Sequence, residues 1–224
     1  MELSKTGVVI PAFNAEMTIG RLVRELVDYG FPKKNIIVID DGSSDRTADA
    51  GRQTGCDVIR ESVNHGKGYA LRRGFARAAD LGLSAVVTLD ADGQHRVSEI
   101  REFLTADQSL HLVIGCRTRS RSAMPRRRAL INRTTSLVIS LLSRQYFPDV
   151  QSGYRRVDLS MVNRLPLRMD KFQIDPELAY QTVRRGYRVG FVPVTTVYNG
   201  ERSYIVPLVD TARFVNMAVR FLWR

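Results

Sequence analysis

Two aspartates separated by one residue could hold a divalent cation. Asp90 and Asp92, in the run AVVTLDADGQH, follow a stretch that is typical of a buried strand. In an extended segment two such residues point to the same side, and two carboxylates on one side repel each other unless a cation lies between them. Oxygen ligands suit Mg²⁺ or Mn²⁺, with phosphate oxygens completing the coordination. Gln94 could add an amide oxygen, and His95 could be a ligand, an anion contact or a structural residue.

A second acidic pair follows another apolar run. In IIVIDDGSSD, Asp40 and Asp41 come directly after a strand-like segment. A carboxylate at this place could accept hydrogen bonds from the ring N–H of a nucleobase or from a ribose hydroxyl. The alternative is that Asp41 and Asp45 only form the turn and cap the next helix.

The segment NHGKGYA could bind phosphate. It places two glycines around Lys67 at the predicted start of a helix, and the backbone N–H groups of a helix N-terminus suit a diphosphate. The sequence has neither the Walker A spacing nor a G-x-G-x-x-G run after the first strand. The alternative is a turn with an exposed lysine.

Arginines dominate the stretch between Gly115 and Arg133, which contains no acidic residue. The seven are Arg117, Arg119, Arg121, Arg126, Arg127, Arg128 and Arg133. Because arginine binds phosphate through a fixed fork of donors, this stretch could hold an anionic acceptor or lie on anionic lipid; a solvated surface is the usual explanation. The net charge of +11 does not choose among anionic partners. No aromatic residues interleave with the arginines and no DNA-binding module is present, so nucleic acid is not expected.

The scaffold that positions these residues is predicted from periodicity. A chain of 224 residues can form one sizeable core. Apolar runs typical of strands occur at 7–10, 36–39, 58–59, 85–89, 112–114 and 189–194. Helical periodicity occurs at 17–29, 47–54, 67–81, 97–104, 129–144, 176–185 and from 206 onward. This alternation predicts an α/β fold, a three-layer α/β/α sandwich with a mostly parallel central sheet.

The carboxyl ends of the predicted strands carry the candidate site residues. Ligands of such sheets bind beyond these ends. Residues 11–14, 40–45, 90–95 and 115–117 each follow a predicted strand. We therefore expect all four groups to line one edge of the sheet.

Five segments together resemble the family 2 glycosyltransferases. They are VVIPAFNAEMTI, IIVIDDGSSDRT, NHGKGYALRRGF, LDADGQH and DVQSGYR, and they occur in the expected order. Within that family the chain is most similar to the dolichol- and polyprenyl-phosphate sugar transferases. The resemblance implies a GT-A, Rossmann-like fold and an inverting transfer from a nucleotide diphosphate sugar, of the GDP-mannose or UDP-glucose type, to a polyprenyl or dolichyl phosphate. It also implies Mg²⁺ or Mn²⁺ as cofactor.

The resemblance implies a role for each motif residue. Donor-binding positions are Pro11, Ala12, Asn14, Asp40 or Asp41, Lys67, Asp90 and Ala91. Metal-binding positions are Asp90, Asp92 and Gln94. Arg117 and Arg133 would face the acceptor phosphate, and Gln151, Ser152, Gly153, Tyr154 and Arg155 would line the acceptor side. The catalytic candidates are Asp92, Arg117, Arg133 and Asp175.

The nature of the acceptor stays open at this stage. A lipid phosphate is already ionised and needs no general base, whereas a sugar hydroxyl needs one. Asp175, in FQIDPEL, is the candidate base for a hydroxyl acceptor in polysaccharide or glycolipid synthesis. A nucleotide-binding module without catalysis is a further alternative.

The domain organisation and location are also predictions. We expect a single domain, with a donor and metal half at 1–117, an acceptor half at 118–200 and an amphipathic helix at 201–224. The first residues lack the pattern of a signal peptide, and no apolar run approaches the ~20 residues of a membrane span. We expect a cytoplasmic protein that contacts the inner face of the membrane through the basic loop 117–133 and helix 206–224, although that helix could instead pack on the core.

Overall fold

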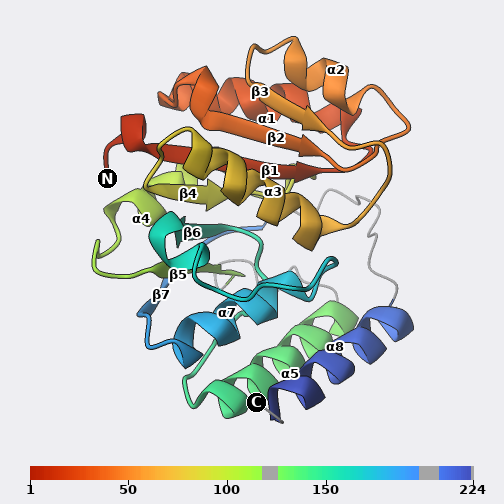
Figure 1. Cartoon of the computed structure of the whole chain (residues 1–224), viewed down its shortest axis with the longest axis vertical. Coiled ribbons are helices and arrows are strands. Elements are labelled where there is room, and N and C mark those ends of the chain that lie inside the picture. Colours follow the sequence, from red (N-terminus) through yellow and green to blue (C-terminus); the bar gives the residue numbers. More distant parts are fainter. Residues whose placement is uncertain (118–125, 197–206, 223–224) are drawn as a thin grey trace.

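The computed structural model describes residues 1–117, 126–196 and 207–222, except for the side chains of 126–128, 207–211 and 222. Seven strands in this part of the chain form one sheet with the order β3-β2-β1-β4-β6-β5-β7 (Figure 1). The strands are β1 (Thr6–Ala12), β2 (Ile36–Asp40), β3 (Asp57–Arg60), β4 (Ala85–Thr88), β5 (Leu112–Cys116), β6 (Arg155–Asp158) and β7 (Val189–Pro193). The predicted layered, mostly parallel α/β architecture is confirmed, because only β6 runs antiparallel to its neighbours.

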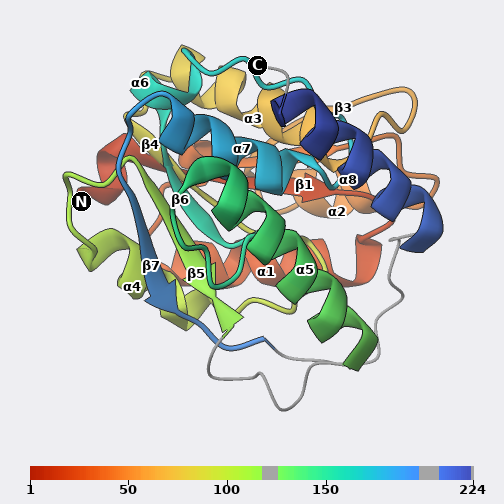
Figure 2. The same ribbon diagram turned by 90° about the horizontal axis from the view of Figure 1, so that it is seen from below.

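Helices cover both faces of this sheet (Figure 2). They are α1 (Glu16–Tyr29), α2 (Thr47–Arg52), α3 (Lys67–Asp80), α4 (Ile100–Thr105), α5 (Arg126–Ser143), α6 (Leu159–Val162), α7 (Ile174–Arg184) and α8 (Pro207–Leu222), with short 3-10 turns at Leu3–Lys5, Lys33–Asn35 and Val97–Glu99. Alternate residues of each strand enter two separate cores. Val9 packs with α3, α5, α7 and α8 on one face, whereas Val8 packs with α1 and α4 on the other.

The predicted alignment of strand ends is confirmed. β1 and β2 are parallel, with Ala12 opposite Asp40, and β4 is parallel to β1. β4 and β5 both run antiparallel to β6 and therefore share one direction. The segments that follow β1, β2, β4 and β5 consequently leave the sheet at the same edge.

β6 is the strand that the sequence analysis missed. Its sequence, RRVD, lacks an apolar run because it begins with two arginines. Both are buried, and Arg156 donates to the backbone carbonyls of Phe103, Ala106, Asp107 and Leu110 at 2.8–3.2 Å. These four bonds satisfy a guanidinium group that would otherwise be costly to bury. The reversed direction of β6 brings the residues before it to the carboxyl edge.

The described part of the C-terminal helix packs on the core. Met217 and Phe221 of α8 are buried, and the Phe221 ring stacks on Tyr180 of α7 at a centroid distance of 4.0 Å. No helix within the described ranges is long and apolar enough to cross a membrane.

Replacing Arg156 by methionine should lower the free energy of unfolding by about 3 kcal/mol, because one buried and three partly buried hydrogen bonds to backbone carbonyls are lost. Urea denaturation followed by circular dichroism measures the loss. Arg164→Met, at an exposed position, is the matched control and should leave stability nearly unchanged. Equal stability of the two variants would contradict the role given to Arg156.

Candidate active site

A lysine joins two carboxylates at the carboxyl edge of the sheet. Lys67, the first residue of α3, places its Nζ 2.7 Å from Asp90 Oδ1 and 3.0 Å from Asp175 Oδ2. His95 Nε2 lies 3.5 Å from the other oxygen of Asp90. Burial opposes ionisation of Asp90, but Lys67 and His95 outweigh it and hold the pKa of Asp90 well below its usual range. Burial likewise opposes the charge of Lys67, and the two carboxylates raise its pKa above the usual value.

The second aspartate of the pair is only partly exposed. Asp92 Oδ1 accepts a hydrogen bond from the Gln94 backbone N–H at 2.9 Å. Burial, and then the negative charge of Asp90, raise the pKa of Asp92. The hydroxyl of Thr18 in α1 donates to the carbonyl of buried Ala91 at 2.6 Å and so fixes the backbone between the two aspartates. This pair carries the like-charge conflict that a cation would relieve.

A glycine makes room beside Asp90. A Cβ on Gly153 would lie 2.6 Å from Lys67 Nζ and would also collide with both Asp90 carboxylate oxygens. Thr88 Oγ1 donates to the Gly153 carbonyl at 2.6 Å and holds this backbone in place. The hydroxyl of neighbouring Ser152 is buried and has no hydrogen-bond partner among the described residues. The segment before β6 therefore approaches Asp90 more closely than a residue with a side chain could.

The residues present fit a hard divalent cation. No group of three His, Cys, Asp or Glu side chains suited to a metal exists within the described ranges. Mg²⁺ in phosphate-transfer sites is commonly held by one or two carboxylates and by substrate phosphates. Asp90 and Asp92 would supply the two carboxylates, and the half-buried Gln94 lies on the same loop.

The two aspartates after β2 have different environments. Asp41 accepts from the backbone N–H groups of His65 and Gly66, at 2.9 and 2.6 Å, one with each oxygen. Asp40 is fully buried, and its Oδ2 has no hydrogen bond to any described residue, with Arg60 Nε 3.6 Å away. Asp41 therefore holds the loop before α3, while Asp40 retains an unused acceptor atom.

The loop after β1 is joined to the loop after β2. Asn14, whose φ is +50°, donates its backbone N–H to Ser43 Oγ at 2.9 Å and accepts from the Ser44 N–H at 3.0 Å. Pro11 is half-buried and Ala12 is buried. The side chain of Asn14 thus bridges the two loops and fixes their relative position.

The start of α3 differs from the expected phosphate cradle. The N–H groups of Gly68 and Tyr69 both donate to the Asp170 carbonyl, at 2.7 and 3.2 Å. A Cβ on Gly68 would collide with the Met169 carbonyl. The expectation that these N–H groups bind a diphosphate is thus corrected, because the carbonyl of Asp170 already caps them. The Lys67 ammonium is directed to the site.

Arg117 is tied to a buried carboxylate. Its Nε and Nη2 each lie 2.7 Å from an oxygen of Asp149, and its backbone N–H also donates to that side chain. Burial alone would raise the pKa of Asp149, but the bonds and charge of Arg117, with a bond from Asn132, lower it. The guanidinium is therefore held rigidly at the end of β5.

The remaining residues of the predicted basic loop are only partly described. Arg133 lies on α5 with an exposed side chain. Residues 118–125, which include Arg119 and Arg121, and the side chains of 126–128 lie outside the described part of the chain.

Besides Ser152, two of the predicted acceptor-binding side chains are buried, those of Tyr154 and Arg155. The Tyr154 hydroxyl donates to the Arg96 carbonyl at 3.2 Å. Arg155 donates to the carbonyls of Ser152, Val150 and Asp175 at 2.6–2.7 Å. Contrary to the expectation from sequence, neither side chain faces a surface that an acceptor could reach. They shape the segment that carries Ser152 and Gly153.

Asp175 is also held by cations. It is buried, and its carboxylate pairs with Lys67 and, at 3.4 Å, with Arg155 Nε. The structure thus brings Asp175 together with Asp90 through a shared lysine. A free general base would lack such neutralising contacts.

Sequence reasoning missed two positioning residues. Thr18 and Asp149 act through the backbone of Ala91 and the side chain of Arg117. Asp149 begins the segment DVQSGYR, so its place in that motif was the available signal. Thr18 lies in the segment VVIPAFNAEMTI, so its place in that motif was likewise the available signal, although it stands on a regular helix.

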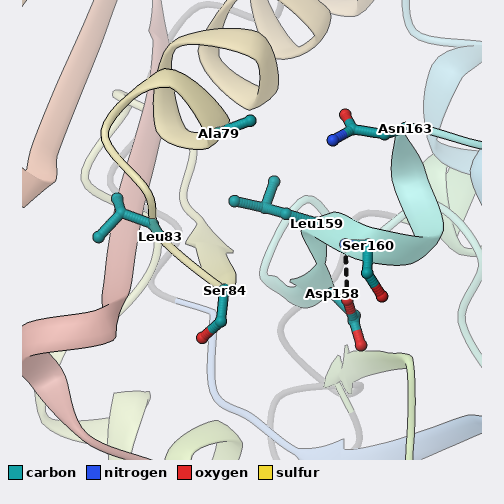
Figure 3. Close-up of a pocket in the computed structure, with 7 residues that line it drawn as sticks. All are labelled: Ala79, Leu83, Ser84, Asp158, Leu159, Ser160 and Asn163. Carbon is teal, nitrogen blue, oxygen red and sulfur yellow. Dashed lines mark hydrogen bonds between the residues drawn. The ribbon is translucent and has the colours of Figure 1, made fainter.

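One hollow lies away from this site, and another borders it at Thr18 and His95. The first, of about 450 Å³, is found at the opposite end of the sheet, where Ser84 precedes β4 and Asp158 ends β6 (Figure 3). Its single carboxylate already accepts from the Ser160 N–H at 2.7 Å. The other, of about 530 Å³, lies between α1 and residues 93–98. Neither gathers the carboxylates described above.

Comparison with known proteins gives one family match. The model of the family described as glycosyl transferase family 2 matches residues 7–168. A polyprenol monophosphomannose synthase of Mycolicibacterium smegmatis is 31% identical over 206 residues, which cover 85% of this chain and 77% of that protein. A UDP-N-acetylglucosamine–dolichyl-phosphate N-acetylglucosaminyltransferase of Methanococcus voltae is 29% identical over 215 residues, which cover 85% of each.

A solved structure has the same fold. Glucosyl-3-phosphoglycerate synthase from Mycobacterium tuberculosis, crystallised with Mn²⁺, UDP-glucose and phosphoglyceric acid, superposes with a TM-score of 0.74. The match covers 97% of this chain and 78% of that one, at 20% sequence identity.

Replacing Asp149 by asparagine should destabilise the protein by about 2–3 kcal/mol at pH 7, because a buried charge pair is broken. The pKa of Asp149 lies below its ordinary value, so its carboxylate stabilises the fold above pH ~4, and this contribution is lost as the pH falls further. The difference in unfolding free energy between wild type and variant should therefore shrink in acid. Denaturation curves at several pH values measure it. Asp28→Asn is an exposed control, and a difference independent of pH would contradict the assignment.

Proposed function

The chain belongs to glycosyl transferase family 2, and from this premise we propose that it transfers a sugar from a nucleoside diphosphate sugar to the phosphate of a polyprenyl or dolichyl lipid, with inversion at the anomeric carbon. The observation that carries the proposal is the contact of Asp90 with Lys67 beside Gly153 at the carboxyl edge of the sheet, with Asp92 two residues further along the same loop. The acceptor class is supported by the names of the two relatives, a polyprenol monophosphomannose synthase from M. smegmatis and a dolichyl-phosphate N-acetylglucosaminyltransferase from M. voltae.

Asp40 is the proposed contact for the donor's base or ribose. Its buried Oδ2 lacks a hydrogen bond, whereas both oxygens of Asp41 are already used by backbone N–H groups. A ring N–H or a ribose hydroxyl would satisfy this acceptor, and an unsatisfied buried oxygen is costly. Pro11, Ala12 and Asn14 would form the adjoining wall through their backbone.

Asp90 and Asp92, with Gln94 nearby, would hold Mg²⁺ or Mn²⁺ together with the donor diphosphate. The cation supplies stabilisation of the charge that develops on the leaving diphosphate. Lys67 would exchange part of its contact with Asp90 for a phosphate oxygen, which keeps a positive charge at the leaving group. Crystals of the M. tuberculosis glucosyl-3-phosphoglycerate synthase contain Mn²⁺ with the donor, which supports this assignment.

The acceptor phosphate would lie against Arg117, with Arg133 on its outer side. Asp149 fixes the orientation of the Arg117 fork. A phosphate oxygen attacks the anomeric carbon, forms the new C–O bond, and the electrons of the broken bond leave with the diphosphate. No proton needs to be removed, because the phosphate is ionised at neutral pH. The neutralising contacts of Asp175 with Lys67 and Arg155 agree with a site that needs no general base.

The whole chain would act as one domain at a membrane surface. Residues 1–117 would bind donor and metal, and 118–200 would bind the acceptor. The basic loop 117–133 and helix 206–224 would supply peripheral contact at the inner, cytoplasmic face, where a lipid phosphate is presented.

Transfer of label to lipid tests the function directly. Incubation with radiolabelled GDP-mannose, UDP-glucose and UDP-N-acetylglucosamine, each with polyprenyl phosphate and Mg²⁺, should move label from one donor into the organic phase. Asp92→Ala should abolish the transfer, because one of two cation ligands is lost. Asp80→Ala, an exposed aspartate at the end of α3, is the control. Undiminished turnover of Asp92→Ala would refute the metal assignment, and donor binding without transfer would indicate a non-catalytic module.

Asp175→Asn separates the two acceptor classes. For a phosphate acceptor, kcat should fall less than about tenfold with an unchanged pH profile, whereas loss of a general base costs about 10²–10⁴-fold. Rates with polyprenyl phosphate should be compared with stability from urea denaturation, because the substitution also removes a partner of Lys67. A loss beyond 10²-fold in a stably folded variant would favour a sugar hydroxyl as acceptor.

A further inference from the structure

Helix α5 carries a stripe of leucines on its solvent side. Leu130, Leu137 and Leu141 are 66%, 59% and 69% exposed. Their spacings of seven and four residues place them on one face of a helix with 3.6 residues per turn. Tyr146, just beyond the helix, is also exposed. Scattered exposed leucines need no explanation, but an aligned set on one helix does.

The buried face of α5 is mostly polar. Its buried side chains are Asn132, Thr135, Ser136, Ile139 and Ser143, and the half-buried Leu142 also packs against the core.

These hydroxyl groups are used inside the protein. Ser136 Oγ accepts from the Val150 N–H at 3.0 Å, and Ser140 Oγ accepts from the Phe147 N–H at 2.9 Å. α5 is therefore inverted relative to an ordinary surface helix, whose apolar face points to the core. The inversion means that the leucines do not stabilise the isolated fold and are placed to meet something apolar outside it.

The charges around the stripe indicate what that partner is. α5 contains no acidic residue, and Arg133 and Arg144 are exposed beside the leucines. Contact with a second copy of this chain through the same face would bring arginines against arginines, which is unfavourable. An anionic lipid surface offers both an apolar layer and phosphate groups for the arginines.

We infer that the stripe formed by Leu130, Leu137 and Leu141 lies in the headgroup region of an anionic phospholipid bilayer, with Arg144 at a lipid phosphate. This inference rests on the proposed function for its biological setting and makes it more specific. α5 follows residues 118–125, which themselves follow Arg117 at the site. In both views α5 and α8 lie side by side (Figures 1 and 2), at the end of the molecule opposite α2 in Figure 1. Docking through α5 would place the acceptor side of the sheet edge toward the bilayer.

Vesicle flotation tests the surface without any substrate. The wild-type chain should float with phosphatidylglycerol vesicles and much less with phosphatidylcholine vesicles, and salt should weaken the binding. The double variant Leu137→Gln/Leu141→Gln should lower the partition coefficient at least about tenfold. Met17→Gln/Val63→Gln is the matched control, because both residues are exposed apolar side chains outside α5.

Several results would overturn the inference. They are no binding of the wild-type chain to anionic vesicles, equal binding by the wild type and the leucine variant, or an equal loss of binding in the control variant. A dimer in solution that the leucine substitutions disperse, with no vesicle binding, would instead assign the stripe to a second copy. The leucine variant should still use a short, water-soluble polyprenyl phosphate as wild type does. Intact flotation without any sugar transfer would count against the proposed function alone.

Discussion

A single buried ammonium group holds the site together. Lys67 Nζ lies between a carboxylate after β4 and one in α7, and removing it would leave like charges facing each other in a poorly solvated place. This arrangement bears on how the proposed ligands would bind. A donor phosphate would compete with the carboxylates for Lys67, and a divalent cation would compete with Lys67 for Asp90. Binding would then be an exchange of ionic partners, which avoids the larger cost of leaving a buried charge without a partner.

The reversed strand β6 is what brings the two halves of the chain to that lysine. Because β6 is antiparallel to β4 and β5, the residues before it meet the segments that follow those strands. Gly153 then reaches Asp90 at a distance that excludes a side chain. The arginines at the start of β6 bind backbone carbonyls on both sides of the sheet. They hold the strand in register, although their polar side chains make it unlike a strand in the sequence.

Six strands, the seven longer helices and the common edge could be predicted because apolar residues repeat with the periods of strands and helices. β6 could not, since Arg155 and Arg156 are buried against backbone carbonyl groups, and those that bind Arg156 lie 46–53 residues away in the chain. Which of Asp40 and Asp41 is available to a ligand also could not be predicted from sequence. The structure shows that the backbone N–H groups of residues 65–66 bind the carboxylate of Asp41. The side chains of Tyr154 and Arg155 were misplaced for the same reason: the motif is right, but its burial is a tertiary property.

The carbonyl of Asp170 caps the N-terminus of α3, and Arg72 of that helix binds both Met169 and Asp170. A loop from the second half of the chain thus caps a helix of the first half. A chimera that joins the N-terminal half of one homologue to the C-terminal half of another would have to keep these contacts between α3 and residues 169–170. Under the proposed function, donor preference and acceptor preference would therefore not evolve as independent modules in this architecture.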